Sequence, residues 1–337
     1  MSALPPEPVT AFGPGRVNLI GEHTDYNDGL SMPFAIERGV TVTATPAERF
    51  VVDARDFGER DEFTEPERAD GWRAFARGMV AELRAAGFDV APAHLEISGD
   101  LPQGSGLSSS AALEAALALA LLGRAPEDLK ALAQLCSRVE NDWVGAETGL
   151  LDQIASLMSR EGHVLQIDFR SLEVRPVPFD LGDWTLVTVE SGATHTHAGS
   201  GYNERRAECR AACEALGIAS LRDAHDLSAL GGTLLKRARH VVSENARVEA
   251  TADALQAQDL QRVGELLDAS HASLRDDYEA SVPQVEATVE RLTAAGAAGA
   301  RMVGGGFGGS VLALLPPGVV RPAGALAVAP HLPARLL

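Results

Sequence analysis

The sequence predicts an α+β fold in two domains, and three observations lead to this prediction. The chain has 337 residues, about twice the length of a typical domain. Apolar residues make up 45% of it and charged residues 23%, the balance found in globular proteins that bury a core. Short stretches rich in β-branched residues are interspersed with helical patterns in the first half, and helical patterns dominate the second half.

Strand and helix signals follow one another in the first third of the chain. Residues 40–44 alternate β-branched residues and predict a strand, as do 51–52 and 94–97. A helix is predicted over 72–87, because apolar residues recur there at three- and four-residue spacing and a glycine ends the pattern. The alanine- and leucine-rich residues 108–122 predict a second helix, since both residue types have high helix propensity.

A third helix is predicted to begin at residues 126–128, because proline and acidic residues are favoured in a first helical turn. Further along, strands are predicted at 164–169, 186–189 and 311–315, and helices at 203–216, 232–256, 260–277 and 282–295. A domain boundary is expected near residues 178–183. It divides the chain into an N-terminal domain, 1–180, and a C-terminal domain, 181–337.

Charge and cysteine content exclude several classes of protein. The net charge of −18 argues against nucleic acid or an anionic membrane as a partner, because the overall field repels polyanions. No apolar run reaches the length of about 18 residues that a membrane span needs, and the N-terminus does not resemble a signal peptide. Three cysteines form neither a zinc pattern nor a disulfide framework, so we expect a cytoplasmic protein.

Lysine occurs only twice, as Lys130 and Lys236, and neither follows a glycine-rich loop. The Walker A loop and the strand lysine of protein kinases are therefore absent. If the protein handles phosphate, then backbone amides, arginine and a metal ion must hold it.

The segment 101–112 has the composition of a phosphate-binding loop. Gly104 and Gly106 permit backbone conformations that are closed to other residues, and the loop runs directly into a helix. Amide groups and the positive end of the helix dipole therefore converge on one point, where the serines 108–110 add hydroxyl groups. This pattern predicts a polyphosphate site. The alternative is an ordinary helix capped by a serine after a glycine turn.

Glu140 lies four residues after Cys136 and eight after Leu132, which places it on the edge of an apolar helical stripe. A half-buried carboxylate is costly unless it is paired or bound to a metal ion. Mg²⁺ prefers one or two hard oxygen ligands together with phosphate and water, so Ser110 and Glu140 could hold it against a triphosphate. A surface position for Glu140 is the alternative.

Residues 13–26 concentrate polar side chains between glycines: Arg16, Asn18, Glu22, His23, Asp25 and Tyr26. A hydroxyl-rich ligand needs several donors and acceptors on one surface, and this cluster offers both. Read as a metal site it is poor, because His23 and Asp25 supply only two ligands. A solvated polar turn is the alternative.

Two further segments suggest chemistry. Asp152 follows the Glu140 helix after a break at Gly145 and returns toward the same end of the domain, where a carboxylate could act as a general base. Helix capping is the ordinary role of such an aspartate. Residues 304–309 contain five glycines in six positions, which is typical of close approach between backbone and ligand.

Together, these segments resemble the three signature motifs of the GHMP kinase superfamily. Gly15-Arg-Val-Asn-Leu-Ile-Gly-Glu-His-Thr-Asp-Tyr26 is similar to the galactokinase signature, and the second and third motifs match at 102–112 and 304–310. The segments Glu140-Asn-Asp-Trp-Val-Gly and Gly149-Leu-Leu-Asp-Gln153 also resemble this family. The similarity runs from about residue 9 to about 315, and all motifs occur in order.

The resemblance implies ATP-dependent phosphorylation of α-D-galactose at its C1 hydroxyl, the first committed step of galactose use by the Leloir pathway. It implies an N-terminal domain like ribosomal protein S5 domain 2 and a ferredoxin-like C-terminal domain, with the site between them. ATP and Mg²⁺ are the implied cofactors, galactose and ATP the implied partners, and we expect a monomer.

The resemblance also assigns roles to individual residues. Asp152 is the expected catalytic base, with Arg16 as its cationic partner near the transferring phosphoryl group. The residues expected to hold the sugar are Glu22, His23, Asp25, Gly149 and Tyr202. Those expected around the nucleotide are Gly104, Gly106, Ser108 and Ser109 at the phosphates, Trp72 and Phe75 at the adenine, and Ser110 and Glu140 on Mg²⁺.

Two alternatives stay open at this point. A related sugar kinase, such as one for N-acetylgalactosamine, differs in the room it leaves at the C2 position of the sugar. A non-catalytic galactose and ATP sensor is the alternative of another class; such a relative lacks a Ser-Ala pair of the second motif, whereas Ser110 and Ala111 are present here.

The end of the chain departs from the family pattern. Only residues 311–337 follow the third motif, where family members usually continue through a further helix and a final strand. This tail is apolar and interrupted by prolines. The third motif is intact, so we expect the chemistry to be kept, while the packing at the edge of the C-terminal domain is left undetermined.

Overall fold

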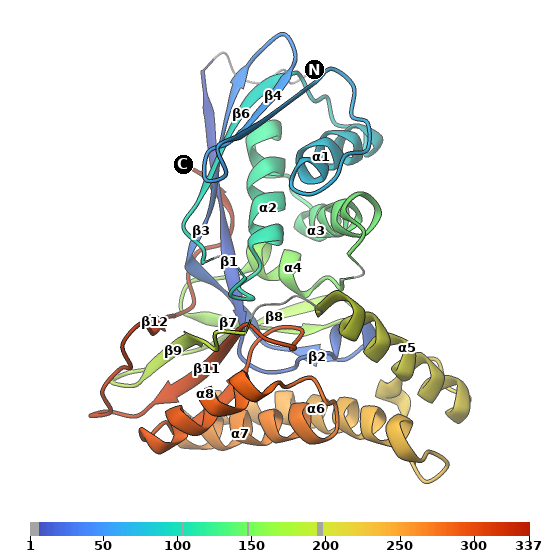
Figure 1. The fold of residues 1–337 in the computed structure, drawn as a ribbon, viewed down its shortest axis with the longest axis vertical. Coiled ribbons are helices and arrows are strands. Elements are labelled where there is room, and N and C mark those ends of the chain that lie inside the picture. The colour runs from blue at the N-terminus through green and yellow to red at the C-terminus, as the bar shows by residue number, and fades with distance from the viewer. Residues whose placement is uncertain (1–6, 103, 147, 194–197) are drawn as a thin grey trace.

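The computed structural model describes residues 7–102, 104–146, 148–193 and 198–337, and it confirms the α+β class (Figure 1). In Figure 1 an upright body of strands and helices, coloured blue to green, stands on a lower layer coloured yellow to red. The body is formed mainly by the first half of the chain and the lower layer mainly by the second half. The two halves meet at the waist of the molecule.

The upright body contains a six-stranded sheet in the order β13-β1-β3-β6-β4-β5. Its neighbours are antiparallel except for β4 and β6, which are parallel. The strands from this half are β1 (Val9–Asn18), β3 (Pro33–Pro46), β4 (Phe50–Ala54), β5 (Glu59–Phe63) and β6 (Ala93–Gly99). The predicted strands at 40–44, 51–52 and 94–97 are thus confirmed.

Helices cover one face of this sheet. They are α1 (Arg73–Ala85), α2 (Ser109–Leu122), α3 (Leu129–Arg138) and α4 (Leu151–Met158). The side chains of α2 are buried on nearly all sides, because it lies between the sheet and the other helices (Figure 1). This burial explains why the helix is rich in alanine and leucine instead of being amphipathic. The start of α2 points down toward the waist.

The third predicted helix changes geometry near its end. It is α-helical to Arg138 and continues as the π-helix η2 (Val139–Val144), which ends at Gly145 with a φ of 85°. Glu140 lies in the first turn of this π-helix. π-helical turns are rare and are frequent at functional sites.

A small sheet and a short helix complete the waist. The sheet has the order β2-β7-β8, with β2 (Leu30–Ser31), β7 (His163–Asp168) and β8 (Glu173–Pro178). The 3₁₀-helix η1 (Asp25–Asn27) follows β1 and carries part of the first motif.

The lower layer has a four-stranded antiparallel sheet in the order β10-β11-β9-β12. Its elements are β9 (Thr185–Glu190), α5 (Ala198–Leu216), η3 (Leu221–Asp223), α6 (Gly232–Gln256), α7 (Leu260–Asp276), α8 (Pro283–Ala294), β10 (Gly299–Met302), β11 (Ser310–Leu315) and β12 (Leu326–Ala327). In Figure 1, α6, α7 and α8 lie beneath the sheet. The helices predicted for this half are confirmed.

The C-terminal tail connects the two sheets. β12 pairs with β9 and takes an edge of the lower sheet, and β13 (Arg335–Leu336) pairs with β1 at the edge of the upper sheet. The division of the chain at residues 180 and 181 stays a prediction.

One apolar cluster runs through the waist. Val17 and Leu19 from the N-terminal half pack in it with Val248 and Leu312 from the C-terminal half, and all four are fully buried. A continuous apolar contact makes the relative position of the two halves costly to change. Within the described residues, no helix is long and apolar enough to cross a membrane.

The largest difference from the sequence prediction is β1. The sequence suggested only a polar cluster over residues 13–26, whereas β1 continues to Asn18 and pairs with β3 along its length, with a register shift between Pro14 and Arg16. Such a bulge re-aims a side chain. Tertiary pairing here overrides the glycine and proline residues that weaken the strand signal.

Candidate active site

A cavity of about 560 Å³ lies at the waist and gathers nearly all of the predicted site residues. Its described lining includes Arg16, Glu22, His23, Asp25, Gly104, Gly106, Ser108, Ser109, Ser110, Glu140, Gly149, Asp152 and Tyr202. Gly304, Gly305 and Gly306 of the third motif close it from the C-terminal half. Segments that are distant in sequence thus meet at one place.

The predicted phosphate-binding loop before α2, called the phosphate loop below, forms one wall of this cavity with residues 101–102 and 104–108. Gly104 and Gly106 have φ values of 70° and 75°, which only glycine adopts readily, and Ser108 has a φ of 58° just before α2 begins. The Ser108 side chain does not cap α2 but bonds to Asp152. The alternative of an ordinary serine-capped helix is therefore wrong, and the first amide groups of α2 keep their capacity to bind an anion.

Arg16 and Asp152 form a two-point ion pair in the cavity wall. Arg16 Nε donates to Asp152 Oδ1 at 2.6 Å and Arg16 Nη2 donates to Oδ2 at 2.8 Å. Arg16 Nη1 donates to the carbonyl of Gly106 at 2.6 Å, so the same guanidinium also holds the phosphate loop. Bidentate pairs of this kind are strong and directional.

Charge in the cavity is strongly unbalanced. Among its described lining residues, Arg16 is the only one with a permanent positive charge. It shares the cavity with the carboxylates of Glu22, Asp25, Glu140 and Asp152. Although burial opposes it, the charges of Asp152 and Glu22 raise the pKa of Arg16 above its ordinary value. A polyphosphate therefore has to bring positive charge with it when it enters this site.

Ser110 and Glu140 fit a magnesium ion, which would bring positive charge into this acidic cavity. Burial, and then the nearby charge of Asp152, raises the pKa of Glu140; hydrogen bonds from Ser110, Thr148 and Gln153 act in the opposite direction. Glu140 is only 6% exposed, so its alternative as a surface residue is wrong. A hydroxyl and a carboxylate are the hard oxygen ligands that Mg²⁺ takes alongside phosphate and water. Among the described residues no three His, Cys, Asp or Glu side chains cluster to hold a metal ion by themselves.

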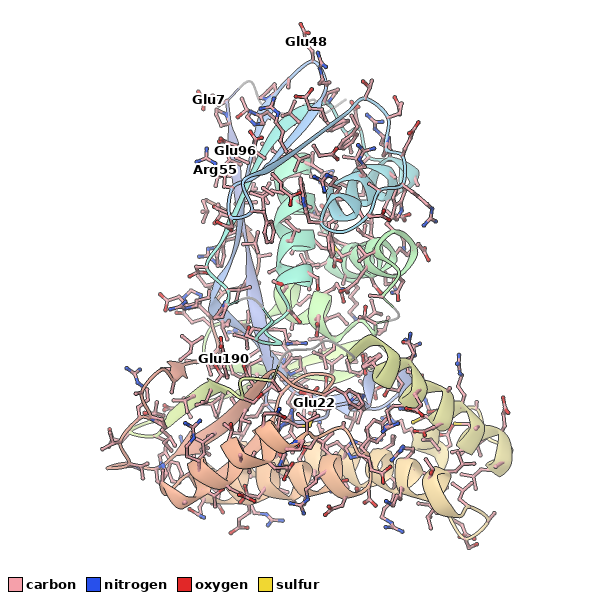
Figure 2. All side chains as sticks on the ribbon, viewed as in Figure 1. Glu7, Glu22, Glu48, Arg55, Glu96 and Glu190 are labelled. Atoms are coloured by element: carbon pink, nitrogen blue, oxygen red, sulfur yellow. The ribbon has the colours of Figure 1, made fainter. Side chains whose placement is uncertain are left out.

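Glu22 links the first motif to the third. Its Oε1 atom accepts hydrogen bonds from Arg301 Nη2 and from the amide of Gly304, the latter at 2.8 Å. Figure 2 shows Glu22 at the waist, just above the lower layer. One of its oxygens thus holds the glycine loop, and this structural role was not foreseen from the sequence.

His23 and Asp25 lie in the same wall and are perturbed by burial. Burial lowers the pKa of His23 to about 3, so its imidazole is neutral. Burial, and then the charge of Asp152, raises the pKa of Asp25 to about 7. Gly149 leaves room for Asp25, since a Cβ atom on Gly149 would lie 1.8 Å from Asp25 Oδ2.

Tyr202 reaches the cavity from α5 in the C-terminal half. Its ring centroid lies 5.4 Å from that of His23 and 5.3 Å from that of Tyr26. Burial raises its pKa well above the ordinary value, so the phenol keeps its proton. The site therefore has walls from both halves.

Trp72 and Phe75 are not among the residues that line this cavity. Trp72 precedes α1 and donates its indole N–H to Glu59 Oε2 at 2.9 Å, with the guanidinium of Arg73 4.8 Å from its ring. Phe75 packs against the core of the N-terminal half. A role for this pair beside the adenine stays a prediction.

Sequence reasoning missed several supporting residues. Glu244 of α6 accepts hydrogen bonds from the amide of Gly21 at 3.0 Å and from Ser270 at 2.7 Å. Although burial opposes it, the charge of Arg247 lowers the pKa of Glu244 to about 2. Glu244 lies at helical spacing from Val241 and Val248, the same signal that identified Glu140. Arg301, by contrast, lies in strand β10, and the spacing of the residues around it gives no indication of its role.

Comparisons with known families agree with this geometry. The model described as galactokinase galactose-binding signature matches residues 2–46, the GHMP kinases N terminal domain matches 74–160, and the GHMP kinases C terminal model matches 251–324. The three matched regions contain the first, second and third motifs in turn.

Curated relatives cover most of the chain. A galactokinase of Mycobacterium tuberculosis (strain ATCC 25618 / H37Rv) is 46% identical over 324 residues, which span 91% of this chain and 89% of that protein. A galactokinase of Haemophilus influenzae (strain ATCC 51907 / DSM 11121 / KW20 / Rd) is 42% identical over 328 residues, covering 91% and 85%.

Solved structures extend the similarity to the fold. The Lactococcus lactis galactokinase complexed with galactose has a TM-score of 0.90 and 34% identity, covering 98% of this chain and 95% of that chain. A mevalonate kinase has a TM-score of 0.67 at 16% identity, which shows a shared fold alone. With these identities over most of its length, and with its three motifs meeting in one cavity, the chain belongs to the galactokinase family of the GHMP kinase superfamily.

Proposed function

We propose that the protein transfers the γ-phosphoryl group of ATP to the C1 hydroxyl of α-D-galactose and releases galactose 1-phosphate and ADP. The observation that carries this proposal is the Arg16–Asp152 pair, which lies between the phosphate loop and the sugar motif in one cavity. Membership of the galactokinase family supports the same activity, as does the crystallisation of the Lactococcus lactis relative with galactose.

In this proposal Asp152 takes the proton of the C1 hydroxyl. An ionised carboxylate offers about four lone-pair sites, and Arg16 and Ser108 use three of those on Asp152. One site is left to accept the sugar proton. As the proton moves, the C1 oxygen forms its bond to the γ-phosphorus and the bond from this phosphorus to the bridging oxygen of ADP breaks.

Arg16 and the phosphate loop stabilise the charge of the transferring group. Phosphoryl transfer depends on positioning and electrostatics more than on covalent chemistry. The amides after Gly104 and Gly106, with Ser108 and Ser109, are suited to cradle the phosphates. When bound at Ser110 and Glu140, Mg²⁺ would supply further positive charge to the phosphate oxygens.

The sugar is held by Glu22, His23, Asp25, Gly149 and Tyr202 in this proposal. Galactose differs from glucose in the direction of one hydroxyl, at C4. A buried site that hydrogen-bonds a hydroxyl rejects the analogue that misplaces it, because its own polar groups are left unpaired. We therefore expect a clear preference for galactose.

We further propose that the protein acts as a monomer in the cytoplasm, with galactose and ATP as its partners. The three cysteines are free thiols, and two of them, Cys136 and Cys209, are buried. Light scattering during size-exclusion chromatography tests the monomer.

A sugar panel tests the proposed activity. ATP turnover is measured with D-galactose, D-glucose, N-acetylgalactosamine and mevalonate at matched concentrations. We expect galactose to be used with the highest kcat/KM. Equal use of galactose and glucose would contradict the sugar assignment, and turnover of N-acetylgalactosamine alone would favour the related sugar kinase.

A further inference from the structure

The segment 21–30 carries the predicted sugar-binding side chains of the first motif, and helix α6 of the C-terminal half holds its start. Glu244 Oε1 accepts a hydrogen bond from the Gly21 amide at 3.0 Å, and His240 Nε2 lies 3.1 Å from the carbonyl oxygen of Glu22. Both side chains of α6 are fully buried. They are four residues apart, so one face of the helix makes both contacts.

Side chains of the C-terminal half also hold the end of this segment. Asn245 of α6 accepts a hydrogen bond at Oδ1 from the Leu30 amide at 2.8 Å. Two side chains at the start of η3 donate to backbone carbonyls of the segment: Ser220 Oγ to Asn27 at 2.7 Å, and Arg222 Nη1 to Asp28 at 2.9 Å. Both ends of the segment are therefore fixed by the half of the chain to which it does not belong.

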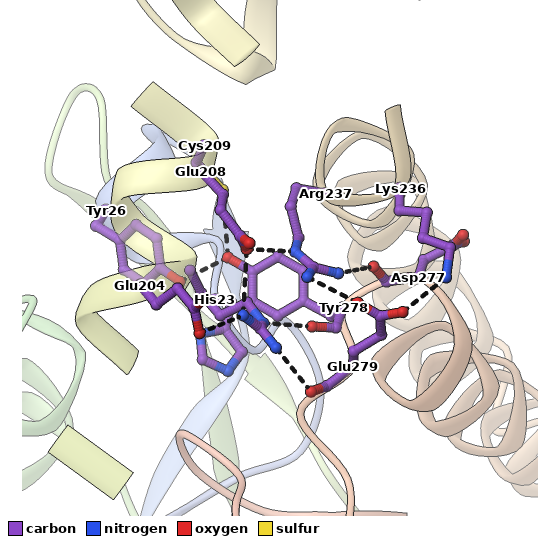
Figure 3. Close-up of polar contacts among 11 residues, drawn as sticks. His23, Tyr26, Glu204, Glu208, Cys209, Lys236, Arg237, Asp277, Tyr278 and Glu279 are labelled. Atoms are coloured by element: carbon purple, nitrogen blue, oxygen red, sulfur yellow. Dashed lines mark hydrogen bonds and ion pairs between the residues drawn. The ribbon is translucent and has the colours of Figure 1, made fainter. Parts of the chain in front are cut away.

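The backbone between these ends needs such support. Gly21 has a φ of 94° and His23 a φ of 62°, and residues other than glycine rarely adopt this left-handed region. A conformation of this kind costs energy and persists only where the surrounding structure holds it. Figure 3 shows Tyr278 beside His23, with its hydroxyl 2.6 Å from that of Tyr26. The ring centroid of Tyr278 lies 4.5 Å from that of His23 and 4.4 Å from that of His240.

The contacts of His240 define which of its nitrogens carries the proton. Burial lowers the pKa of His240 to about 4, so its imidazole is neutral at neutral pH and has one N–H group. A carbonyl oxygen can only accept, so the proton lies on Nε2 and is donated to Glu22. Nδ1 then accepts from the hydroxyl of Ser273, 2.8 Å away. Both ring nitrogens are thus engaged within the protein.

We propose that His240 and Asn245 are positioning residues, which hold the two ends of the segment 21–30 and thereby keep Asp25 and its neighbours at the sugar cavity. Neither is among the described residues that line the cavity, so their effect on the sugar passes through the backbone of the segment. The inference rests on the proposed function for the identity of the sugar. The phosphate loop lies outside the segment, so nucleotide binding should not depend on these contacts.

Two amide substitutions at position 240 separate the hydrogen bond from the bulk of the side chain. The amide nitrogen of glutamine reaches about as far as Nε2 of histidine, whereas that of asparagine reaches only as far as Nδ1. His240→Gln can therefore still donate to Glu22, and His240→Asn leaves this carbonyl without its donor. Thr251→Val is the control, because Thr251 is also fully buried in α6 but bonds to the carbonyl of Arg247 in the same helix.

The first test needs no substrate. Hydrogen–deuterium exchange of peptides that cover residues 19–31 is followed by mass spectrometry in the wild type and the three variants. We expect exchange there to be about 5-fold faster or more in His240→Asn, and close to wild type in His240→Gln and Thr251→Val. Unchanged exchange in His240→Asn overturns the proposal. An equal rise in peptides from β6 also overturns it, because the variant would then have lost overall stability instead of local order.

The second test measures the effect on the sugar. His240→Asn should raise the galactose KM about 5-fold or more and leave kcat and the ATP KM within about threefold of wild type, whereas His240→Gln should restore a galactose KM close to wild type. Asn245→Leu should also raise the galactose KM, and it replaces His240→Asn if that variant does not fold. Equal rises in both KM values, or equal effects of asparagine and glutamine at position 240, overturn the proposal.

Failure of the proposed function would be seen separately. If the wild type does not turn over galactose, the sugar assignment is contradicted, and the exchange experiment by itself decides whether α6 positions the segment. Faster exchange confined to residues 19–31 in His240→Asn would then support the positioning role, and wild-type exchange would overturn it.

Discussion

At the residue scale, Asp152 has the contacts of a catalytic base held in place. Both of its oxygens are engaged by Arg16, and Ser108 adds a third bond. Asp152→Asn should lower kcat by about 10²- to 10⁴-fold, the usual effect of losing a general base, with galactose and ATP binding near normal. Steady-state kinetics and calorimetric binding measure the two effects separately. Near-full turnover would place the base elsewhere.

Gly149 shows how a residue without a side chain can be essential to the predicted sugar site. A Cβ at this position would lie 1.8 Å from Asp25 Oδ2 and 2.7 Å from its Cγ. Gly149→Ala should displace Asp25 at a cost of about 1–3 kcal/mol, seen as a galactose KM raised about 10-fold or more while the ATP KM is unchanged. Gly231→Ala is the control, because a Cβ there meets nothing within 4 Å. An unchanged galactose KM in Gly149→Ala would remove Asp25 from the sugar site.

At the element scale, the π-helix after α3 turns Glu140 toward the phosphate loop. The carboxylate accepts hydrogen bonds from Thr148 at 2.9 Å and from Gln153 at 2.7 Å, both on Oε2. Glu140→Gln should raise the Mg²⁺ concentration for half-maximal rate by about 10-fold or more and leave the galactose KM largely unchanged. A magnesium titration measures this, with Glu127→Gln at an exposed position as the control. A loss confined to galactose binding would assign Glu140 to the sugar instead.

A second glutamate, Glu114, lies in the middle of α2 and is fully buried. Gln153 donates to its Oε2 at 3.1 Å, and its Oε1 has no partner among the described residues. Burial, and then the charge of Glu140, raises the pKa of Glu114 well above 4.5. A protonated Glu114 carries no charge to bury, so its neutral form suits this site.

This raised pKa predicts how stability depends on pH. The folded state keeps a proton that the unfolded state loses above its pKa of about 4.5, so the free energy of unfolding falls as the pH rises beyond that value. Glu114→Gln removes this effect and keeps the hydrogen bond with Gln153. We expect its melting temperature to match wild type near pH 4 and to exceed it increasingly up to pH 8. A constant difference across this range would mean that Glu114 is ionised in the folded protein.

At the scale of the whole molecule, a buried ion pair connects the two halves. Arg301 in β10 is fully buried and donates to Glu22, which also accepts from the amide of Gly304. Arg301→Met leaves Glu22 buried without its partner and should lower the free energy of unfolding by about 3–5 kcal/mol. Urea denaturation measures it. Arg262→Met, at a pair that is half exposed, should cost less than about 1 kcal/mol. Equal losses in both variants would mean that the Glu22 pair does not hold the halves together.

Much of the fold could be predicted from local patterns. Helical periodicity and capping signals identified α1, α3 and the long helices of the C-terminal half, because each buries one face and shows it in the spacing of apolar residues. The fully buried α2 was identified by its alanine and leucine content, and α4 was not predicted. The strand β1 was not predicted, since its pairing with β3 and the bulge after Pro14 depend on a partner that is distant in sequence. The strand at the end of the chain was not predicted either. Residues 335–336 pair with β1, and nothing in their local sequence indicates this pairing.

The sequence by itself determined the chemistry available to this protein: a glycine–serine loop before a helix, a polar first motif, two carboxylates at helical positions, and almost no lysine. Motif order was enough to indicate the family. Only the tertiary structure decided which groups meet, because contacts such as Arg16 with Asp152, Glu22 with Arg301 and Tyr26 with Tyr278 join residues more than 100 positions apart. It also decided protonation, since the shifted pKa values of His23 and Asp25 arise from burial, which is a property of packing and not of residue type.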